Sequence, residues 1–403
     1  MLENCMIVQS GGPTAVINNS MIGLIDQIHI ANFKGKIYGA IGGIHGLIHD
    51  SFIDLSELSP NDRERLRWTP GAALGTCRHK LTDDEIEKII YILKKYNIRF
   101  FFYIGGNGSM KVAKLIDDRA KMTGFNLTVI GIPKSIDNDL LETDHSPGYG
   151  SASKFLATSI LDMKMDVASY PYNKRVTIIE TMGRHTGWLA AACSLATYEK
   201  DYSQNLIYIP EAPFDLDQCL VKIKKAQQEN RDTFIMVAEG IKDNLGQLIN
   251  DENVEYDLLG RPKLGGVSSY LKGIVESETG IETRAIAPSI WQRSSMLHSS
   301  RTDVEEAYEL GKQSWYYAEK GYSSVMVSMD KEEDSLKDYK INYRPKPLEK
   351  VAGKEKFVPK SWYDEKNNNM ANEFIKYVEP LIQGEVVLPR ERGLPIYKQV
   401  IGQ

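Results

Sequence analysis

Cysteine is scarce in this chain, and its four copies give no sign of a disulfide framework or a zinc site. The 403 residues contain Cys5, Cys77, Cys193 and Cys219, which are scattered and lack C-x-x-C spacing. Such a set is typical of reduced thiols in a cytoplasmic protein. We therefore expect free cysteines, a cytoplasmic location and no structural zinc.

Long hydrophobic runs and an excess of positive charge are also missing. No apolar stretch approaches the ~20 residues that span a bilayer. The first residues lack the basic start and apolar core of a signal peptide, so we expect neither a membrane partner nor export. The chain carries 49 Lys and Arg against 54 Asp and Glu. This balance argues against a nucleic-acid partner, although a few local cations suffice for a phosphorylated substrate.

Short β-rich runs alternate with amphipathic helical stretches, which predicts a doubly wound α/β fold. Residues 81–97 are predicted to contain a helix with Thr82 as its N-cap, because three acidic residues follow this threonine and precede the apolar positions. The expected strands cover residues 5–9, 36–41, 100–104, 127–132, 176–180, 206–209, 233–238 and 285–286.

The C-terminal part of the chain has a different composition. From about residue 330 to 366 it turns polar and contains Pro345, Pro347 and Pro359. This predicts an irregular surface segment that ends near a buried Trp362-Tyr363 pair. A last helix is expected over 372–381.

Glycine-rich turns follow two of the expected strands, at 10–13 and 105–109, and a third lies in a loop at 71–78. Ligands of open α/β sheets bind beyond the carboxyl ends of the strands, where glycine lets the backbone approach a phosphate. Each turn alone could equally be a tight connection. None matches G-x-G-x-x-G or G-x-x-x-x-G-K-[ST], which argues against Rossmann and P-loop sites.

The segment Pro-Lys-Ser-Ile-Asp-Asn-Asp at 133–139 carries the strongest chemical signal. Asp137 and Asp139 follow a strand and stand beside Lys134. In phosphoryl transfer a carboxylate can accept the proton of the attacking hydroxyl, while cations offset charge on the transferring group. The alternative is a solvated acidic loop.

This run, with Gly-Gly-Asn-Gly-Ser at 105–109 and Glu-Thr-Met-Gly-Arg at 180–184, resembles the phosphofructokinases. The resemblance covers at least residues 5–300. The Gln-Ser-Gly-Gly start and Met-Gly-Arg-His-Thr-Gly-Trp at 182–188 resemble the compact branch usually associated with pyrophosphate.

The resemblance implies a phosphofructokinase-like fold of two doubly wound domains with interleaved sheets and the active site in the cleft between them. It implies a donor domain at 1–145, a fructose 6-phosphate domain at 146–300, and a segment at 301–403 that packs on both. The implied activity is Mg²⁺-dependent transfer to the 1-hydroxyl of fructose 6-phosphate in glycolysis. The implied assembly is a homodimer or homotetramer with sites at the interface.

The resemblance also assigns roles to residues. Asp137 matches the general base, and Arg184 and Lys134 match cations that offset the charge of the transferring group. The positions that match the donor-phosphate site are Gly12, Arg78, Gly106, Gly108, Ser109 and Lys134. The positions that match the sugar-phosphate site are Ser135, Asp137, Arg175, Met182, Gly183, Arg184, Glu239, Arg284 and Arg293.

Within the second set, Arg284 and Arg293 match arginines that grip the 6-phosphate, and Arg175 matches one lent across a subunit interface. Ser135 stands where relatives usually have threonine. Asp139 is expected to help hold the site.

Two departures from the family pattern concern the donor. Asn107 stands where many relatives have a magnesium-linked aspartate, and an amide can still hold a metal-bound water. Gly108 stands where pyrophosphate-using relatives typically have aspartate, whereas the lysine that accompanies it is present as Lys134. Because glycine leaves room for an α-phosphate, we expect ATP to be slightly favoured, with pyrophosphate as the alternative.

The residues alone leave two other classes of function open. A non-catalytic regulatory subunit that binds sugar phosphate is suggested only by Asn107, and the retained Asp137 and Arg184 argue against it. A relative of the lipid or NAD kinases shares a similar glycine turn, and the segment at 133–139 disfavours it.

Overall fold

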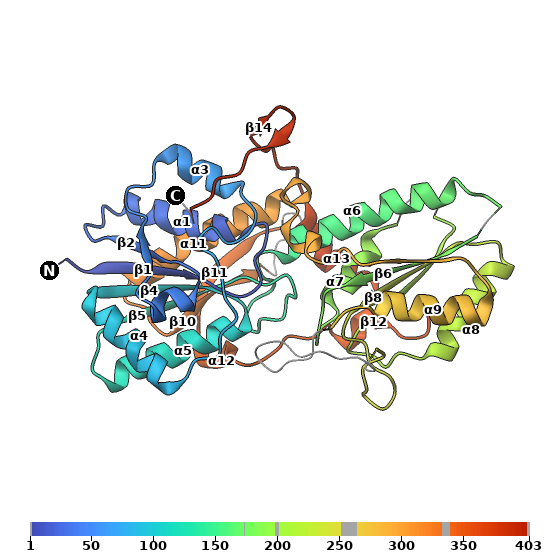
Figure 1. Cartoon of the computed structure of the whole chain (residues 1–403), viewed down its shortest axis with the longest axis horizontal. Coiled ribbons are helices and arrows are strands. Elements are labelled where there is room, and N and C mark those ends of the chain that lie inside the picture. Colours follow the sequence, from blue (N-terminus) through green and yellow to red (C-terminus); the bar gives the residue numbers. More distant parts are fainter. Residues whose placement is uncertain (1, 173, 198–200, 251–263, 333–338, 401–403) are drawn as a thin grey trace. The chain divides into compact units, whose positions relative to one another are not determined.

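The computed structural model describes residues 2–172, 174–197, 201–250, 264–332 and 339–400, which form two compact units (Figure 1). Unit 1 comprises Met1–Ser151, Arg293–Lys356 and Gln383–Gln403, and unit 2 comprises Ala152–Gln292 and Phe357–Ile382. The chain thus passes from one unit to the other four times, and its C-terminal hundred residues are divided between them.

Unit 1 is built on a seven-stranded sheet in the order β11-β10-β5-β4-β1-β2-β3. Its five inner strands are parallel, whereas the two edge strands β3 and β11 run antiparallel to their neighbours. The strands are β1 (Asn4–Gln9), β2 (Ile37–Ala40), β3 (Phe52–Asp54), β4 (Ile98–Gly105), β5 (Thr128–Pro133), β10 (Val325–Lys331) and β11 (Ile341–Pro347).

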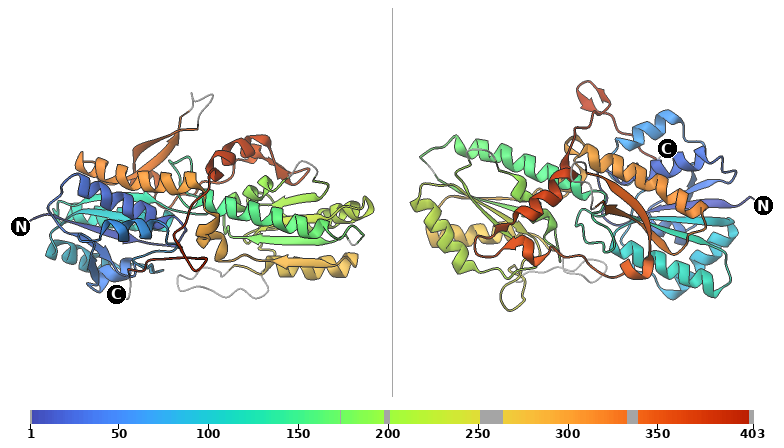
Figure 2. Two further views of the ribbon diagram at one scale, coloured as in Figure 1. Left: turned by 90° about the horizontal axis from the view of Figure 1, so that it is seen from above. Right: turned by 180° about the vertical axis from the view of Figure 1, so that it is seen from behind.

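Helices cover both faces of this sheet (Figure 2). Successive residues of a strand point to opposite faces, so Cys5 and Ile7 of β1 join one apolar core, and Met6 and Val8 join the other. The first core is closed by α1 (Ile17–Ile30) and α11 (Arg301–Glu319), and the second by α4 (Asp83–Lys95) and α5 (Asn107–Met122).

Helices α1 and α11 approach each other closely at Gly23. A Cβ at this position would lie 1.9 Å from the carbonyl oxygen of Tyr308, so only glycine fits. On the other face, α4 begins at the expected cap. The Thr82 hydroxyl accepts from the Glu85 amide, and the Glu85 carboxylate accepts from the Thr82 amide, which completes a capping box.

Unit 2 is built on a four-stranded parallel sheet in the order β7-β8-β6-β9. Its strands are β6 (Val176–Thr181), β7 (Gln204–Tyr208), β8 (Thr233–Ala238) and β9 (Thr283–Ile286). Its helices include α7 (Trp188–Ala192), α8 (Leu216–Gln228), α9 (Val267–Thr279) and α13 (Asn372–Val378), and α6 (Tyr149–Ala168) begins at the end of the first segment of unit 1.

The remaining elements are short. They are α2 (Ile44–Ile48), α3 (Pro60–Arg67), α10 (Trp291–Ser294), α12 (Leu348–Val351), β12 (Tyr363–Asp364), β13 (Asn369–Met370), β14 (Arg390–Glu391), β15 (Leu394–Pro395) and the 3₁₀ turns Cys193–Leu195, Met296–His298, Lys360–Trp362 and Glu379–Ile382.

The eight strands expected from the sequence are all present, and the α/β fold with parallel sheets is confirmed. The sequence missed β3, β10 and β11, and also the two-residue strands β12, β13, β14 and β15. The expectation of an irregular segment at 330–366 was wrong where β11 and α12 form, because proline is tolerated in an edge strand. Trp362 and Tyr363 are half-buried rather than buried, and Trp362 packs against Phe374.

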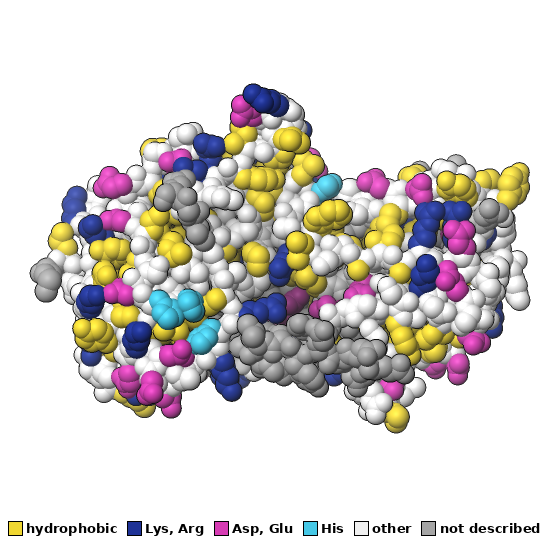
Figure 3. Space-filling view, in the orientation of Figure 1, with side chains coloured by type: hydrophobic (Ala, Val, Ile, Leu, Met, Phe, Trp, Pro, Cys, Tyr) yellow, Lys and Arg dark blue, Asp and Glu magenta, His cyan; other side chains and the backbone are white. Residues whose placement is uncertain are grey.

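All four cysteines are free. Within the described ranges, no helix combines the length and the apolar character that crossing a membrane requires. On the face of the molecule seen in Figure 3, basic and acidic side chains are interspersed, in keeping with the small net charge of −5.

Candidate active site

Three of the segments singled out in the sequence meet at one edge of the unit 1 sheet. Strands β1, β4 and β5 are parallel neighbours, and Gln9 pairs with Ile104 while Gly105 pairs with Pro133. The turn after β1, the turn after β4 and the loop after β5 therefore emerge side by side. The amide of Lys134 donates to the carbonyl of Gly105 at 3.0 Å, which joins the last two.

Lys134 lies under the first of these turns. Its side chain is buried, and its ammonium donates to the carbonyl oxygen of Gly12 at 2.8 Å. Burial lowers the pKa of Lys134 to about 8, although the charges of Asp137 and Asp139 act in the opposite direction. A cation at this depth, beside a glycine turn, is suited to an anionic ligand.

The loop after β5, which carries Asp137, is stabilised by hydrogen bonds between its own residues. The Ser135 hydroxyl donates to Asp139 Oδ1 at 2.8 Å and accepts from the Asp137 amide at 3.2 Å. Asn138 is buried in the left-handed region, with φ of 51°. Burial raises the pKa of the Asp139 carboxyl group. Asp137 and Asp139 are both half-buried, and it is Asp139 that accepts the hydrogen bond of the Ser135 hydroxyl within the loop.

Arg293 lies beside the first glycine turn, in unit 1. A Cβ at Gly12 would be 3.0 Å from its Nη1. Burial lowers the pKa of Arg293, the charge of Arg78 adds to this effect, and the charge of Asp137 opposes it. Arg293 thus lies beside Gly12, a residue predicted for the donor site, and its expected role at the 6-phosphate stays a prediction.

Arg78 is exposed in the loop between α3 and α4. The Thr76 hydroxyl in the same loop donates to the carbonyl of Gly11 at 2.7 Å and ties the loop to the first turn. Gly106 caps α5, and Gly108 is exposed in its first turn, while Ser109 is buried. The donor-site residues expected from the sequence therefore share one edge of unit 1.

In unit 2 the loop after β6 and the residue after β8 are neighbours. The Glu239 amide donates to the carbonyl of Thr181 at 2.9 Å. Gly240 packs so closely that a Cβ there would be 1.9 Å from the Arg184 carbonyl. Gly183 has φ of 141°, a conformation that favours glycine. The structure thus brings together the predicted sugar-phosphate residues Met182, Gly183, Arg184 and Glu239.

Arg175 and Arg284 lie at the opposite end of this sheet. Thr177 of β6 pairs with Arg284 of β9, and Arg175 directly precedes β6. The six residue steps from Arg175 to Thr181 span about 20 Å, and the four steps from Thr177, the partner of Arg284, span about 13 Å, at ~3.3 Å per residue. Within one copy of unit 2, neither arginine therefore lies near Arg184.

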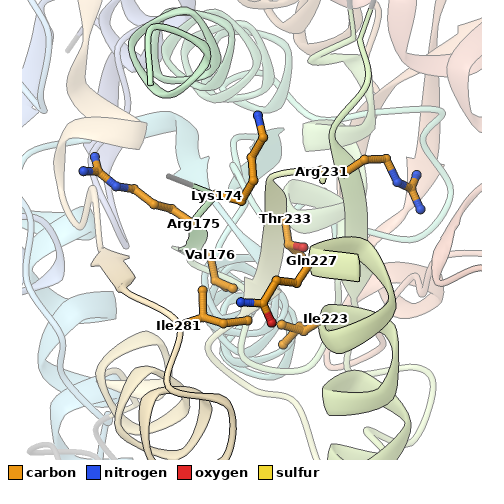
Figure 4. A pocket seen from close by; sticks show the side chains of 8 residues that line it. All are labelled: Lys174, Arg175, Val176, Ile223, Gln227, Arg231, Thr233 and Ile281. Atoms are coloured by element: carbon orange, nitrogen blue, oxygen red, sulfur yellow. The ribbon is translucent and has the colours of Figure 1, made fainter. Parts of the chain in front are cut away.

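Both arginines have local partners. Arg175 Nε is 3.2 Å from Glu282, and its guanidinium lies 4.5 Å from the Tyr170 ring centroid. Arg284 Nη1 is 3.2 Å from Asp166. A small pocket lies beside Arg175. In Figure 4 the Arg175 guanidinium points away from the apolar side chains of this pocket, which are Val176, Ile223 and Ile281.

Asn107 is the expected contact to magnesium, and its amide is engaged at both ends. Nδ2 donates to the carbonyl of Lys354, and Oδ1 accepts from the Gly353 amide at 2.8 Å. Oδ1 keeps one lone pair for a metal-bound water. The described residues contain no cluster of three or more His, Cys, Asp or Glu side chains that could hold a metal.

Histidine side chains gather on the surface of unit 1 (Figure 3). His45 lies on α2 and His49 directly follows its last residue, with ring centroids 4.1 Å apart. They form a pair to which the described residues add no third ligand.

The sequence analysis missed two contacts of the candidate site. Glu211 accepts from the Gly187 amide with both carboxylate oxygens at 3.0 Å, and also from the Val358 amide at 2.9 Å. Burial raises the pKa of Glu211. Glu211 thus fixes the end of the loop that contains Arg184. The second missed contact is that of Asn107 with residues 353 and 354, and no local pattern links positions so far apart.

Comparison with known proteins gives one consistent family. The model of the family described as Phosphofructokinase matches residues 4–314. The chain is 37% identical to "Pyrophosphate--fructose 6-phosphate 1-phosphotransferase" of Xanthomonas campestris pv. campestris, over 98% of this chain and 95% of that protein. It is 35% identical to the protein of the same name from Halomonas elongata, again over 98% and 95%. The crystal structure of the pyrophosphate-dependent phosphofructokinase from Nitrosospira multiformis matches with a TM-score of 0.89 at 32% identity, over 98% of this chain and 96% of that one.

Proposed function

Since the chain belongs to the phosphofructokinase family and is a phosphotransferase, we propose that it phosphorylates the 1-hydroxyl of fructose 6-phosphate with pyrophosphate as the donor. The observation that carries the donor is the buried ammonium of Lys134 under the first glycine turn. The names of the full-length relatives favour the same donor. This replaces the slight preference for ATP that the sequence suggested. The product, fructose 1,6-bisphosphate, places the reaction in glycolysis.

In the proposed mechanism Asp137 accepts the proton of the 1-hydroxyl as this oxygen attacks the terminal phosphorus of pyrophosphate. The new O–P bond forms while the bridging P–O bond breaks, and inorganic phosphate leaves. Lys134, Arg293 and Arg184 offset the charge of the transferring and leaving groups. Because phosphoryl transfer has a loose transition state, positioning and electrostatics supply most of the rate.

Mg²⁺ is proposed to accompany the donor and to neutralise its phosphate charge. This ion usually keeps several waters and is held by substrate phosphates with one or two protein groups. The remaining lone pair of Asn107 Oδ1 and the half-buried Asp137 carboxylate fit such a sparse protein contribution.

The sugar phosphate is proposed to bind the loop Met182–Arg184 and Glu239, with the Ser135 hydroxyl as a further contact. Arg175 and Arg284 lie at the other end of the unit 2 sheet, so we propose that they reach the 6-phosphate of a second copy in a homodimer or homotetramer. Arg293 is proposed on the donor side, since it lies against Gly12.

Arg284→Ala is expected to raise KM for fructose 6-phosphate roughly 10- to 100-fold, the worth of a charged hydrogen bond. The KM for the donor should stay unchanged, because the phosphate contact is the same in the ground and transition states. Steady-state kinetics with each substrate varied in turn measures both. An equal rise in the donor KM would contradict the assignment.

Oligomers that contain two different variants test whether Arg175 acts in the active site of a second copy. Coexpression of Arg175→Ala with Asp137→Ser should restore activity, since one copy then supplies the base and the other the arginine. If both residues served the same copy, the mixture would stay inactive.

The donor is tested by assaying the purified protein with pyrophosphate and with ATP at matched concentrations. We expect the larger kcat/KM with pyrophosphate. Activity with ATP and none with pyrophosphate would contradict the proposed donor, while still agreeing with transfer to fructose 6-phosphate.

ATP is the second candidate, and the space around Gly108 favours it. A Cβ at Gly108 would meet no atom within 4 Å, and the residue is exposed. The first turn of α5 thus leaves room for an α-phosphate.

Gly108→Asp is expected to lower kcat/KM for ATP at least tenfold and to spare pyrophosphate. Two like charges ~4 Å apart repel by about 4 kcal/mol at an effective dielectric of ~20. Gly273→Asp, at another open helical glycine, is the matched control and should change neither value. An equal loss with both donors would show that position 108 does not discriminate between them.

A further inference from the structure

Residues 353–356, which we call the strap, lie between α12 and the passage of the chain into unit 2. The strap is hydrogen-bonded through Asn107 to the glycine turn at 105–109, which we call the donor turn. The amide nitrogen of Asn107 donates to the Lys354 carbonyl, and its oxygen accepts from the Gly353 amide at 2.8 Å. The Asn107 side chain thus forms two hydrogen bonds with the strap backbone, one as donor and one as acceptor.

The other side of the strap contacts the loop that carries Asp137. The Lys356 amide donates to the Asp139 carbonyl at 2.8 Å, and Glu355 forms an antiparallel bridge with Leu140. Two segments more than 200 residues apart in sequence are therefore paired as short extended backbone.

The Lys356 side chain extends this contact. Its ammonium donates to the carbonyl of Asp144 at 2.6 Å and lies 3.4 Å from Asn138 Oδ1. The same Asn138 oxygen accepts from the Ser146 amide at 3.0 Å. Asn138 is the residue directly after Asp137 and has a positive φ, so Lys356 supports the backbone at the point where the loop turns.

The chemistry at position 107 requires an amide. An aspartate could accept from the Gly353 amide, but it has no hydrogen to donate to the Lys354 carbonyl. Its charge would instead face that carbonyl oxygen. The strap therefore gives a reason for asparagine at the position where the family resemblance leads one to expect a magnesium-linked aspartate.

We propose that the strap is a positioning element for phosphoryl transfer, with Asn107 and Lys356 as its positioning residues. It binds the donor turn on one side and the Asp137 loop on the other, all within unit 1. Its function is to hold Asp137 and the donor phosphates at the relative positions that phosphoryl transfer requires. The role in catalysis rests on the proposed function, whereas the contacts themselves do not.

Asn107→Asp is the main test, and Asn4→Asp is its matched control. Asn4 is also half-buried in unit 1, and its amide also donates to a carbonyl, that of Tyr96, and accepts from a backbone amide, that of Lys36. It stands at the start of β1, whereas the donor turn follows the end of the parallel neighbour strand β4.

Hydrogen exchange measured without substrate reports the strap directly. In Asn107→Asp, we expect amides 353–356 and 135–139 to exchange about two- to tenfold faster, the equivalent of one lost hydrogen bond. In Asn4→Asp, the increase should be confined to the region of Lys36 and Tyr96. We also expect kcat to fall several-fold in Asn107→Asp alone, with KM for fructose 6-phosphate nearly unchanged.

Two results would overturn the proposal. One is unchanged exchange of the strap in Asn107→Asp, whatever happens to kcat. The other is a lower Mg²⁺ requirement with undiminished kcat, which would make position 107 a metal contact alone. Lys356→Met provides the same exchange test at 135–139 should Asn107→Asp fail to fold. Because exchange needs no substrate, it separates failure of the strap from failure of the proposed reaction.

Discussion

Asp137→Ser is expected to lower kcat by about 10²- to 10⁴-fold, the usual contribution of a positioned general base. Asp137 is half-buried, and its charge acts on both Lys134 and Arg293. The hydroxyl of serine cannot accept the proton at neutral pH. The KM for fructose 6-phosphate should change far less, and steady-state kinetics separates the two constants.

Asp139→Asn is the matched control for this prediction. The Ser135 hydroxyl donates to Asp139 Oδ1, and an asparagine oxygen can accept the same hydrogen bond. The loop should therefore survive, and kcat should fall much less than in Asp137→Ser. A near-normal kcat in Asp137→Ser, with a large loss in Asp139→Asn, would transfer the role of base to Asp139.

Lys134→Met is expected to lower kcat/KM for pyrophosphate by roughly 10- to 100-fold, because a charged hydrogen bond to the donor is lost. The loss with ATP, if ATP is used, should be smaller. Lys164→Met is the control, since Lys164 is also buried but bonds the Ala196 carbonyl and Asp201 in unit 2. It should affect stability without a change in donor preference. Equal losses of kcat/KM with the two donors would show that Lys134 does not determine which donor the enzyme prefers.

The pH dependence provides a second test of Lys134. Burial lowers its pKa to about 8, so the free enzyme carries the full charge well below pH 8 and loses it above. Asp137 and Asp139 raise this pKa, and Arg293 lowers it. The KM for pyrophosphate of the wild type should therefore rise above about pH 8, whereas that of Lys134→Met should not follow this titration. The same alkaline rise in both proteins would assign it to another group.

The amino-acid sequence by itself determined the parts of this protein that depend on local pattern. Alternating strands and helices predicted the parallel sheets, and the carboxyl ends of β1, β4 and β5 had to emerge at one edge because parallel neighbours end together. The glycine turns and the segment with Asp137 follow those strands. Their order along the chain was therefore enough to identify the family and one face of the candidate site.

Only the tertiary structure decided which distant residues join that face. It placed Arg293 at Gly12, and it set Arg284 and Arg175 at the end of the sheet away from Arg184. It also paired the strap with the Asp137 loop and gave Asn107 its partners. Such contacts join segments up to 247 residues apart, and they depend on packing in three dimensions rather than on any periodicity of neighbouring residues.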